Sequence, residues 1–231
     1  MKQYKHIFFD LDRTLWDFET NSKLTLEEIY SEFDLANLGF NSAEEFITKY
    51  KAINENMWDL YRQGKITKDL LRAGRFEATF LEYGIKDEHL AKSVGHFYVE
   101  QSPIKTALFP NAIEALTYLK KSYHLHIITN GFEEVQFIKL NKSGLEPFFE
   151  VVVTSEQAGC KKPESAIFNY AMKRANAVPS ESIMIGDDVP VDLHGAMKVG
   201  IDSVYFNPMG EKADEQVNFT IQNLIELKEI L

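Results

Sequence analysis

Two carboxylates, Asp10 and Asp12, stand one residue apart directly after a short apolar run. The run 5–9, Lys-His-Ile-Phe-Phe, is typical of a buried strand of a parallel sheet. The acids then lie at its carboxyl end, where open α/β sheets place their chemistry. Such a pair can divide phosphoryl transfer between a nucleophile, Asp10, and an acid–base group, Asp12. The structural alternative is that Asp10 ends a strand and Asp12 caps a turn.

Three later segments place further polar groups where predicted strands or loops end. Each has a structural explanation when taken singly, as a turn, a solvated charge or a helix cap. Their common position along an alternating pattern of strands and helices favours a single site instead. The segments are Thr129-Asn130-Gly131 after the apolar run 124–128, Lys162-Pro163 after a glycine-containing loop, and Gly186-Asp187-Asp188 with Asp192 after the apolar run 183–185.

In this order, the four segments resemble the motifs of the haloacid-dehalogenase (HAD) superfamily of phosphohydrolases. Asp10-Leu11-Asp12-Arg13-Thr14 is similar to the first motif, and the three later segments are similar to the second, third and fourth. The resemblance spans the whole chain and implies an α/β fold, in which a Rossmann-like parallel-sheet core carries an inserted α-helical cap. Arg13 is a departure, since many members have glycine there.

The resemblance implies that phosphate monoesters are hydrolysed through an aspartyl-phosphate intermediate on Asp10. Asp12 would protonate the leaving oxygen and then deprotonate the water that hydrolyses the intermediate. Lys162 would neutralise the phosphoryl group and hold Asp10 ionised. The hydroxyl of Thr129 and the backbone N–H of Asn130 would bind phosphoryl oxygens.

The cofactor that the resemblance implies is Mg²⁺. Its protein ligands would be the Asp10 carboxylate, the Asp12 backbone carbonyl and the Asp187 carboxylate. Asp188 or Asp192 would not bind the metal directly but would orient Lys162 or a metal-bound water. The residue types agree with this metal, because every candidate ligand is an oxygen. The six histidines show no paired metal-ligand spacing.

Within the superfamily, the chain looks most like bacterial pyrimidine 5′-nucleotidases of the housecleaning type. The segments that carry this likeness are 128–132, Lys162-Pro163 with Ile167-Phe168, and Leu70 with Arg75-Phe76. It implies a small phosphate monoester, a nucleoside 5′-monophosphate, as the substrate. Trp16 and Phe18 follow the first motif closely, so an aromatic face could stack on a base there. Arg75 is a further candidate for substrate contact.

Helical spacing dominates from residue 16 to residue 102, and strands and helices alternate beyond it. We therefore expect residues 1–15 and 103–231 to form the catalytic core and residues 16–102 to form the cap. The alternation implies a mainly parallel sheet covered on both faces. Strands are predicted at 124–129, 149–154, 182–185 and 203–206, and helices at 88–98, from 110, at 133–143, at 164–175 and through 196 to glycine at 200.

Composition limits the possible partners and location. The net charge of −10 argues against nucleic acid or an anionic membrane as a partner, because both require a basic patch. Cys160 is the single cysteine, which excludes an internal disulfide and suits a reducing compartment. Residues 1–5 lead directly into the first predicted strand, so we expect no signal peptide and a cytoplasmic location. The oligomeric state stays open.

Other functions share parts of this pattern. A sugar-phosphate phosphatase or phosphomutase keeps the same four motifs. A 2-haloacid dehalogenase also uses an aspartate nucleophile, but it needs no acid for its leaving group, and Asp12 would then be idle. A receiver-like signalling module combines acids, a hydroxyl residue and a lysine around Mg²⁺, but its phosphorylated aspartate lies on a later strand and it has no helical insertion.

Overall fold

The computed structural model describes residues 4–212 and 216–231, and the chain folds as two compact units. The first unit comprises Met1–Phe18 and Thr106–Leu231, and the second comprises Glu19–Lys105. Trp16 and Phe18, which we expected at the start of the helical insertion, thus belong to the first unit. Residues 1–3 belong to the segment for which we expected no signal peptide, and they lie outside the described part of the chain.

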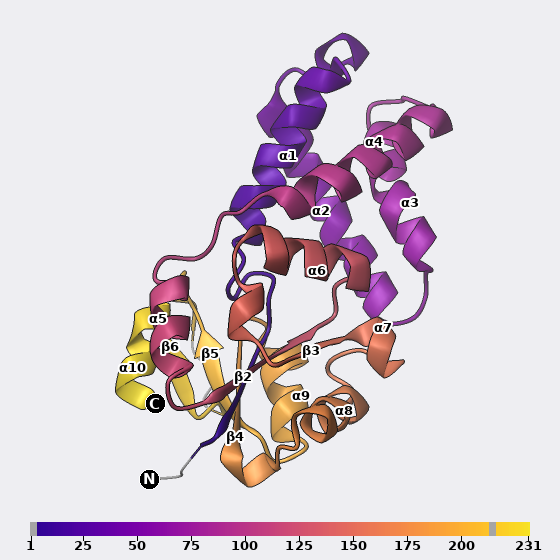
Figure 1. Cartoon of the computed structure of the whole chain (residues 1–231). Helices are drawn as coiled ribbons and strands as arrows, with labels where there is room; N and C mark the ends of the chain where they lie inside the picture. The colour runs from indigo at the N-terminus through magenta and orange to yellow at the C-terminus, as the bar shows by residue number, and fades with distance from the viewer. Residues whose placement is uncertain (1–3, 213–215) are drawn as a thin grey trace. The chain divides into compact units, whose positions relative to one another are not determined.

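The first unit is built on a six-stranded sheet in the order β3-β2-β1-β4-β5-β6 (Figure 1). Every neighbouring pair is parallel. The predicted α/β architecture with a parallel sheet is therefore confirmed. The strands are β1 (His6–Phe9), β2 (His124–Thr129), β3 (Val151–Thr154), β4 (Ser182–Gly186), β5 (Asp202–Phe206) and β6 (Phe219–Ile221).

The strand order reverses between β1 and β4, because the chain runs outward through β2 and β3 on one side and through β5 and β6 on the other. Such a switch point leaves a crevice at the carboxyl ends of the two central strands. Asp10 follows β1 and Asp187 follows β4, and the register pairs Phe9 with Ile185. The fold therefore brings these two acids to the same edge of the sheet.

Helices cover both faces of the sheet, as the alternation of side chains along β1 shows. Ile7 and Phe9 belong to a core cluster that includes Leu116 and Leu140, whereas Phe8 belongs to another that includes Phe168. Because successive strand residues face opposite sides, the two clusters are the two faces. The helices of the first face are α5 (Ala112–Leu119), α6 (Glu133–Lys142) and α10 (Leu227–Ile230), and those of the second are α8 (Ser165–Ala175) and α9 (His194–Met197).

Some predicted boundaries are wrong in detail. α5 begins two residues after Pro110, because Asn111 adopts a left-handed conformation with φ of 65° as its N-cap. The predicted helix through residue 196 is irregular, with a π-helical segment, Val189–Leu193, before α9. Pro190 lies in the first turn of this segment, where a helix makes no use of the missing N–H. β6, α10 and the short α7 (Ser155–Ala158) were not predicted, since three or four residues carry too little periodicity.

The second unit is helical and has its own core. Its helices are α1 (Phe18–Glu32), α2 (Ala43–Arg62), α3 (Lys68–Leu81) and α4 (Glu88–Gln101). Ser42, Thr67 and Asp87 cap three of them by accepting hydrogen bonds from backbone N–H groups. Aromatic residues fill the core, among them Phe46 and Phe80. The helical spacing predicted from the sequence in this segment is thus correct.

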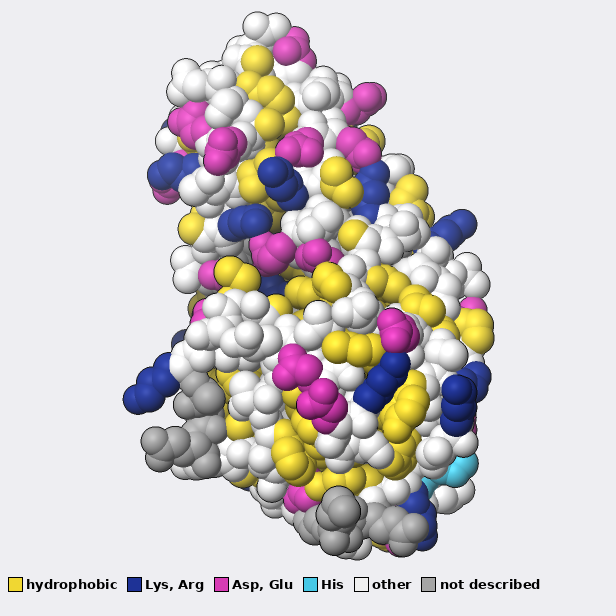
Figure 2. Space-filling view, turned by 90° about the vertical axis from the view of Figure 1, so that its left-hand side faces the viewer, with side chains coloured by type: hydrophobic (Ala, Val, Ile, Leu, Met, Phe, Trp, Pro, Cys, Tyr) yellow, Lys and Arg dark blue, Asp and Glu magenta, His cyan; other side chains and the backbone are white. Residues whose placement is uncertain are grey.

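The surface carries charges of both signs. In the view of Figure 2, Lys and Arg side chains lie among Asp and Glu side chains and do not merge into one continuous patch. Among the described residues, no helix combines the length and the apolar character that crossing a membrane requires.

A pair of histidines forms a buried polar contact within the sheet. Nδ1 of His6 on β1 lies 3.1 Å from Nε2 of His126 on β2. His126 is 1% exposed. Burial, and to a smaller extent the neighbouring His6, lower the pKa of His126 to about 4. His126 is therefore neutral in the folded protein at pH values where it is charged in the unfolded chain.

This shift predicts a loss of stability in acid. Between pH 6.5 and about 4, His126 binds a proton in the unfolded state but not in the folded state. The free energy of unfolding therefore falls as the pH falls. His126→Gln keeps a polar atom near the Nε2 position but has no titrating group. We expect the midpoint of thermal unfolding to depend less steeply on pH in this variant than in the wild type. His96, which is exposed, provides the control. An equal change of slope in His96→Gln would contradict the assignment.

Candidate active site

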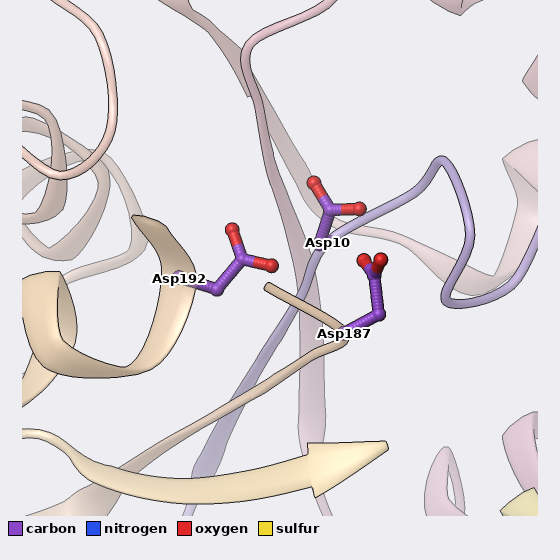
Figure 3. A group of neighbouring side chains, drawn as sticks. All are labelled: Asp10, Asp187 and Asp192. Atoms are coloured by element: carbon purple, nitrogen blue, oxygen red, sulfur yellow. The ribbon is translucent and has the colours of Figure 1, made fainter. Parts of the chain in front are cut away.

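Three carboxylates converge at the carboxyl edge of the central strands. Asp10, Asp187 and Asp192 each offer an oxygen, and these oxygens lie within 4.8 Å of one another. Figure 3 shows the side chains directed toward one another, Asp10 from the end of β1, Asp187 from the end of β4 and Asp192 from the helical segment that follows. Asp10 is 7% exposed and Asp192 is 1% exposed. The structure therefore collects three carboxyl groups, two of them buried, in a small volume.

Glycine at position 186 makes room for this cluster. It is the last residue of β4. A Cβ atom at this position would overlap the Asp192 carboxylate and its Cβ and Cγ atoms. A side chain at position 186 would push Asp192 away from Asp10. This steric requirement explains why glycine precedes Asp187 in the fourth motif.

Lys162 compensates part of the buried charge. Its Nζ lies 2.5 Å from Oδ1 of Asp10 and 2.7 Å from Oδ1 of Asp192, and its side chain is 2% exposed. Burial by itself lowers the pKa of Lys162, but Asp10 and Asp192 raise it above its ordinary value. The ammonium group is thus charged and held between the two acids.

The Asn130 side chain holds the backbone of Lys162 in place. Its Oδ1 accepts a hydrogen bond from the backbone N–H of Lys162 at 2.8 Å, and its Nδ2 donates to the backbone carbonyl of Lys162 at 3.0 Å. The second motif therefore fixes the third. The sequence alone suggested only a backbone role for Asn130 toward a phosphoryl group, and this side-chain role adds to it.

One lysine does not balance the acids of this cluster. Burial raises the pKa of Asp10 to about 7, although the attraction of Lys162 opposes the rise. Burial also raises the pKa of Asp187 well above its usual range, and the charges of Asp192 and Asp10 add to this effect. A further cation among these carboxylates would favour their ionised forms. The donor set, which consists of carboxylate oxygens, fits a hard divalent ion such as Mg²⁺.

The supporting acid Asp188 serves as a local cap. Its Oδ1 accepts a hydrogen bond from the backbone N–H of Val191 at 3.0 Å, at the start of the π-helical segment. Its backbone N–H donates to Oδ2 of Asp192 at 3.2 Å. Asp188 therefore orients the segment that carries Asp192, and Asp192 is the acid that reaches the cluster.

Asp12 lies apart from this cluster and has different partners. Its Oδ1 lies 2.5 Å from Nζ of Lys139, and its Oδ2 accepts a hydrogen bond from Nε2 of Gln136 at 2.7 Å. Gln136 also donates to the hydroxyl of Thr129 at 3.0 Å. Sequence reasoning did not identify Gln136 or Lys139. The available signal was their spacing of three residues in the helix predicted directly after the second motif.

The two aromatic candidates after the first motif have distinct environments. Trp16 has no exposed surface and packs in a core cluster of the sheet, with Nζ of Lys139 lying 4.2 Å from its ring centroid. Phe18 is half-buried, and the Arg13 guanidinium lies 4.7 Å from its ring centroid. The structure thus gives the Trp16 ring packing partners rather than an open face for a base.

The backbone at Arg13 explains the preference for glycine in related loops. Arg13 has φ of 66°, in the left-handed region that disfavours side chains. The contact of its guanidinium with Phe18 compensates part of this cost.

Arg75 lies in the second unit and is 4% exposed. Its Nη1 donates to Oδ1 of Asn54 at 2.9 Å, and its guanidinium lies 4.6 Å from the ring centroid of Tyr98. The ring centroids of Tyr50 and Phe76, which stack on each other, lie 5.8 and 5.5 Å from the guanidinium. Arg75 is therefore part of a buried polar and aromatic network, and its contact with a substrate stays a prediction.

Comparison with known proteins identifies the class to which this fold and site belong. The model of the haloacid dehalogenase-like hydrolase family matches residues 7–206. Since the match covers most of the chain and all four motifs, the chain belongs to this family of hydrolases.

Individual relatives extend over the full length. HAD-hydrolase YfnB of Bacillus subtilis is 31% identical and covers 100% of this chain and 97% of its own. Its crystal structure, described as bound to magnesium, has a TM-score of 0.90 at 28% identity, and the match covers 100% of this chain and 99% of that one. Pyrimidine 5′-nucleotidase YjjG of Escherichia coli is 31% identical over 97% of this chain and 96% of its own. A glyceraldehyde 3-phosphate phosphatase of Methanothermobacter thermautotrophicus is 29% identical, over 98% of this chain and 99% of its own.

The charge balance around Lys162 predicts a strong effect of its removal. Lys162→Met leaves Asp10 and Asp192 buried without their cation, so we expect the free energy of unfolding to fall by about 3–5 kcal/mol. Urea denaturation in the presence of EDTA measures this loss. Adding Asp192→Asn should restore part of it, because one uncompensated charge is then absent.

Lys173 provides the matched control, since it is exposed on α8. Lys173→Met should change the free energy of unfolding by less than about 0.5 kcal/mol. If the double variant were less stable than Lys162→Met alone, the charge-balance explanation would be wrong.

Proposed function

We propose that this hydrolase is a Mg²⁺-dependent phosphatase that works through phosphorylation of Asp10, with pyrimidine nucleoside 5′-monophosphates as its substrates. The observation that carries the proposal is the arrangement of Asp10. Its carboxylate lies at the switch point of the sheet, paired with the buried Lys162 and adjacent to Asp187 and Asp192. An aspartate placed among a lysine and cation-binding acids is suited to attack an anionic phosphate ester.

The metal would be held by the carboxylates of Asp10 and Asp187 and by the backbone carbonyl of Asp12. Bound there, Mg²⁺ would offset the repulsion between the anionic nucleophile and the phosphate dianion. Asp192 supports this site through its contact with Lys162. The raised pKa values of Asp10 and Asp187 support it as well, since buried carboxylates at this density require positive charge to remain ionised.

In the first step, a carboxylate oxygen of Asp10 forms a bond to phosphorus while the bond between phosphorus and the ester oxygen breaks. Asp12, protonated at this stage, gives its proton to the leaving oxygen, and the alcohol departs. Lys162 offsets the charge of the phosphoryl group, and the Thr129 hydroxyl and the Asn130 N–H bind its oxygens.

In the second step, water attacks the phosphorus of the aspartyl phosphate. Asp12, now ionised, takes a proton from the water as the bond from phosphorus to Asp10 breaks. Inorganic phosphate is released, and both aspartates return to their starting states. General acid–base assistance of this kind typically accounts for ~10²–10⁴-fold in rate.

The substrate class rests on sequence relatives. YjjG and a pneumococcal protein, PynA, are both named pyrimidine 5′-nucleotidases, at 31% and 29% identity. Phe18 is the aromatic candidate next to the nucleophile loop that keeps part of its surface exposed. The helical unit would act as a cap that selects the substrate, in keeping with the family. A cytoplasmic location, where nucleotides are found, belongs to the same proposal.

A second candidate is a sugar-phosphate phosphatase. Three relatives named glyceraldehyde 3-phosphate phosphatase match 98–100% of this chain at 29–31% identity. The motifs are the same, so only the substrate differs.

A substrate panel tests the proposal directly. Phosphate release should be fastest with dUMP, UMP or dTMP, with kcat/KM higher than for purine nucleotides, glyceraldehyde 3-phosphate or hexose phosphates. EDTA should abolish the activity and added Mg²⁺ should restore it, because the proposed ligands are hard oxygens. A preference for glyceraldehyde 3-phosphate would select the second candidate. Chloride release from 2-chloropropionate without phosphatase activity would select a dehalogenase.

Asp10→Asn tests the covalent mechanism. The amide is a poor nucleophile, so we expect turnover below detection, while the far-UV circular dichroism spectrum stays unchanged because the buried pocket still accommodates the side chain. Acid quenching of the wild type during turnover of ³²P-labelled substrate should leave label on the protein, and the variant should carry none. Turnover by purified Asp10→Asn near the wild-type rate would refute the mechanism.

A further inference from the structure

Both oxygens of the Asp12 carboxylate are held by side chains of one helix, α6. Lys139 contacts Oδ1 and Gln136 donates to Oδ2. Residues three apart lie on the same face of a helix, so the two side chains reach the same carboxylate together. This leaves the carboxylate little freedom to rotate.

These two polar residues are buried on α6 together with Leu140, while two large apolar residues of the same helix are exposed. Gln136 is 0% exposed and Lys139 is 5% exposed, whereas Phe137 and Ile138 are 39% and 40% exposed. Burying a lysine and an amide in place of two large apolar side chains costs stability. Such destabilising burial of polar side chains is expected mainly at functional sites.

The orientation of Gln136 is fixed by its partners. Its Nε2 donates to Asp12 and to the Thr129 hydroxyl, and its buried Oε1 has no hydrogen-bond partner among the residues that the structure describes. The side-chain amide therefore uses its NH₂ group for both hydrogen bonds, while its carbonyl oxygen accepts none. A side chain at Gly131 would overlap Gln136, so the glycine of the second motif makes room for this contact.

Lys139 is fixed from its other side by aromatic rings. Its Nζ lies 4.2 Å from the ring centroid of Trp16 and 5.9 Å from that of Phe18. A cation over an aromatic face is attracted by the ring quadrupole. The ammonium group therefore lies between the Trp16 ring and the Asp12 carboxylate.

We propose that Gln136 and Lys139 are positioning residues that hold the Asp12 carboxylate in the orientation required for proton transfer to the leaving oxygen and from the attacking water. This inference rests on the proposed phosphatase function, because it concerns the acid–base role of Asp12. Neither residue is assigned a contact with the reacting atoms: Lys139 acts through Asp12, and Gln136 acts through Asp12 and through the Thr129 hydroxyl. Misplacement of a reacting group by about 1 Å can cost on the order of 10²-fold in rate.

The test compares a poor and a good leaving group. Lys139→Met and Gln136→Met keep an unbranched side chain of similar size but remove the contacts to Asp12. With the best alkyl phosphate of the substrate panel, we expect kcat to fall about 10- to 100-fold at nearly constant KM. With p-nitrophenyl phosphate, whose leaving oxygen needs less protonation, the loss should be much smaller. Lys142→Met, at an exposed position on the same helix, is the control and should leave both rates unchanged.

Asp12→Asn separates positioning from general damage to the fold. If Lys139 acts through Asp12, adding Lys139→Met to Asp12→Asn should cause no further loss of kcat, whereas independent effects would multiply. Gln136→Met should lose less in this background than in the wild type, because only its contact with Thr129 is then left to remove, and it carries the test if Lys139→Met proves insoluble.

Two results overturn the proposal. The first is an equal loss of kcat on both substrates, and the second is a full loss from Lys139→Met in the Asp12→Asn background; each would indicate a structural role. The proposed function fails separately: if Asp12→Asn itself slows both substrates equally, Asp12 is not the acid. If Asp12→Asn discriminates between leaving groups and the α6 variants do not, the positioning role alone is wrong.

Discussion

The ammonium group of Lys162, enclosed between Asp10 and Asp192, is the interaction on which the organisation of the site depends. A buried charge is stable only with partners of opposite sign, so both acids must be brought to this lysine. Asn130 meets that requirement by fixing the backbone of Lys162, and Gly186 meets it by leaving space for Asp192. Four segments distant in sequence are therefore tied together by one charge balance.

The same edge of the sheet gives its two neighbouring acids different environments. Asp10 is buried among like charges, and its pKa is raised to about 7. The Asp12 side chain is 26% exposed and is paired with Lys139. Asp10 thus lies in the carboxylate cluster suited to a cation, as its proposed nucleophilic role requires, whereas Asp12 lies outside that cluster and is held by α6. A single residue of spacing is enough for this division, because β1 ends at Phe9 and Asp12 lies in the loop beyond Asp10, within reach of the side chains of α6.

Much of the core could be predicted from the sequence, since its signals are local. The buried strand before Asp10 and the strand 124–129 are short apolar runs, and a parallel sheet needs little more to place their carboxyl ends together. The meeting of Asp10, Lys162 and Asp187 follows from that topology. β6 and the π-helical segment around Pro190 were missed because three residues, or a distorted turn, leave no periodic pattern.

The side chains on α6 show why the remainder of the site could not be predicted. Residue type alone favours burying Phe137 and Ile138 over Gln136 and Lys139, and the structure does the reverse. A prediction from apolar residues reflects only the free energy of burying apolar surface. It is wrong where another contribution to the free energy is larger. Here that contribution is the contact of two donors with the carboxylate of Asp12, which lies more than a hundred positions away in the chain. Only the folded sheet brings α6 and the loop of Asp12 together. The two residues whose burial the sequence does not predict are therefore the ones that hold Asp12 in the site.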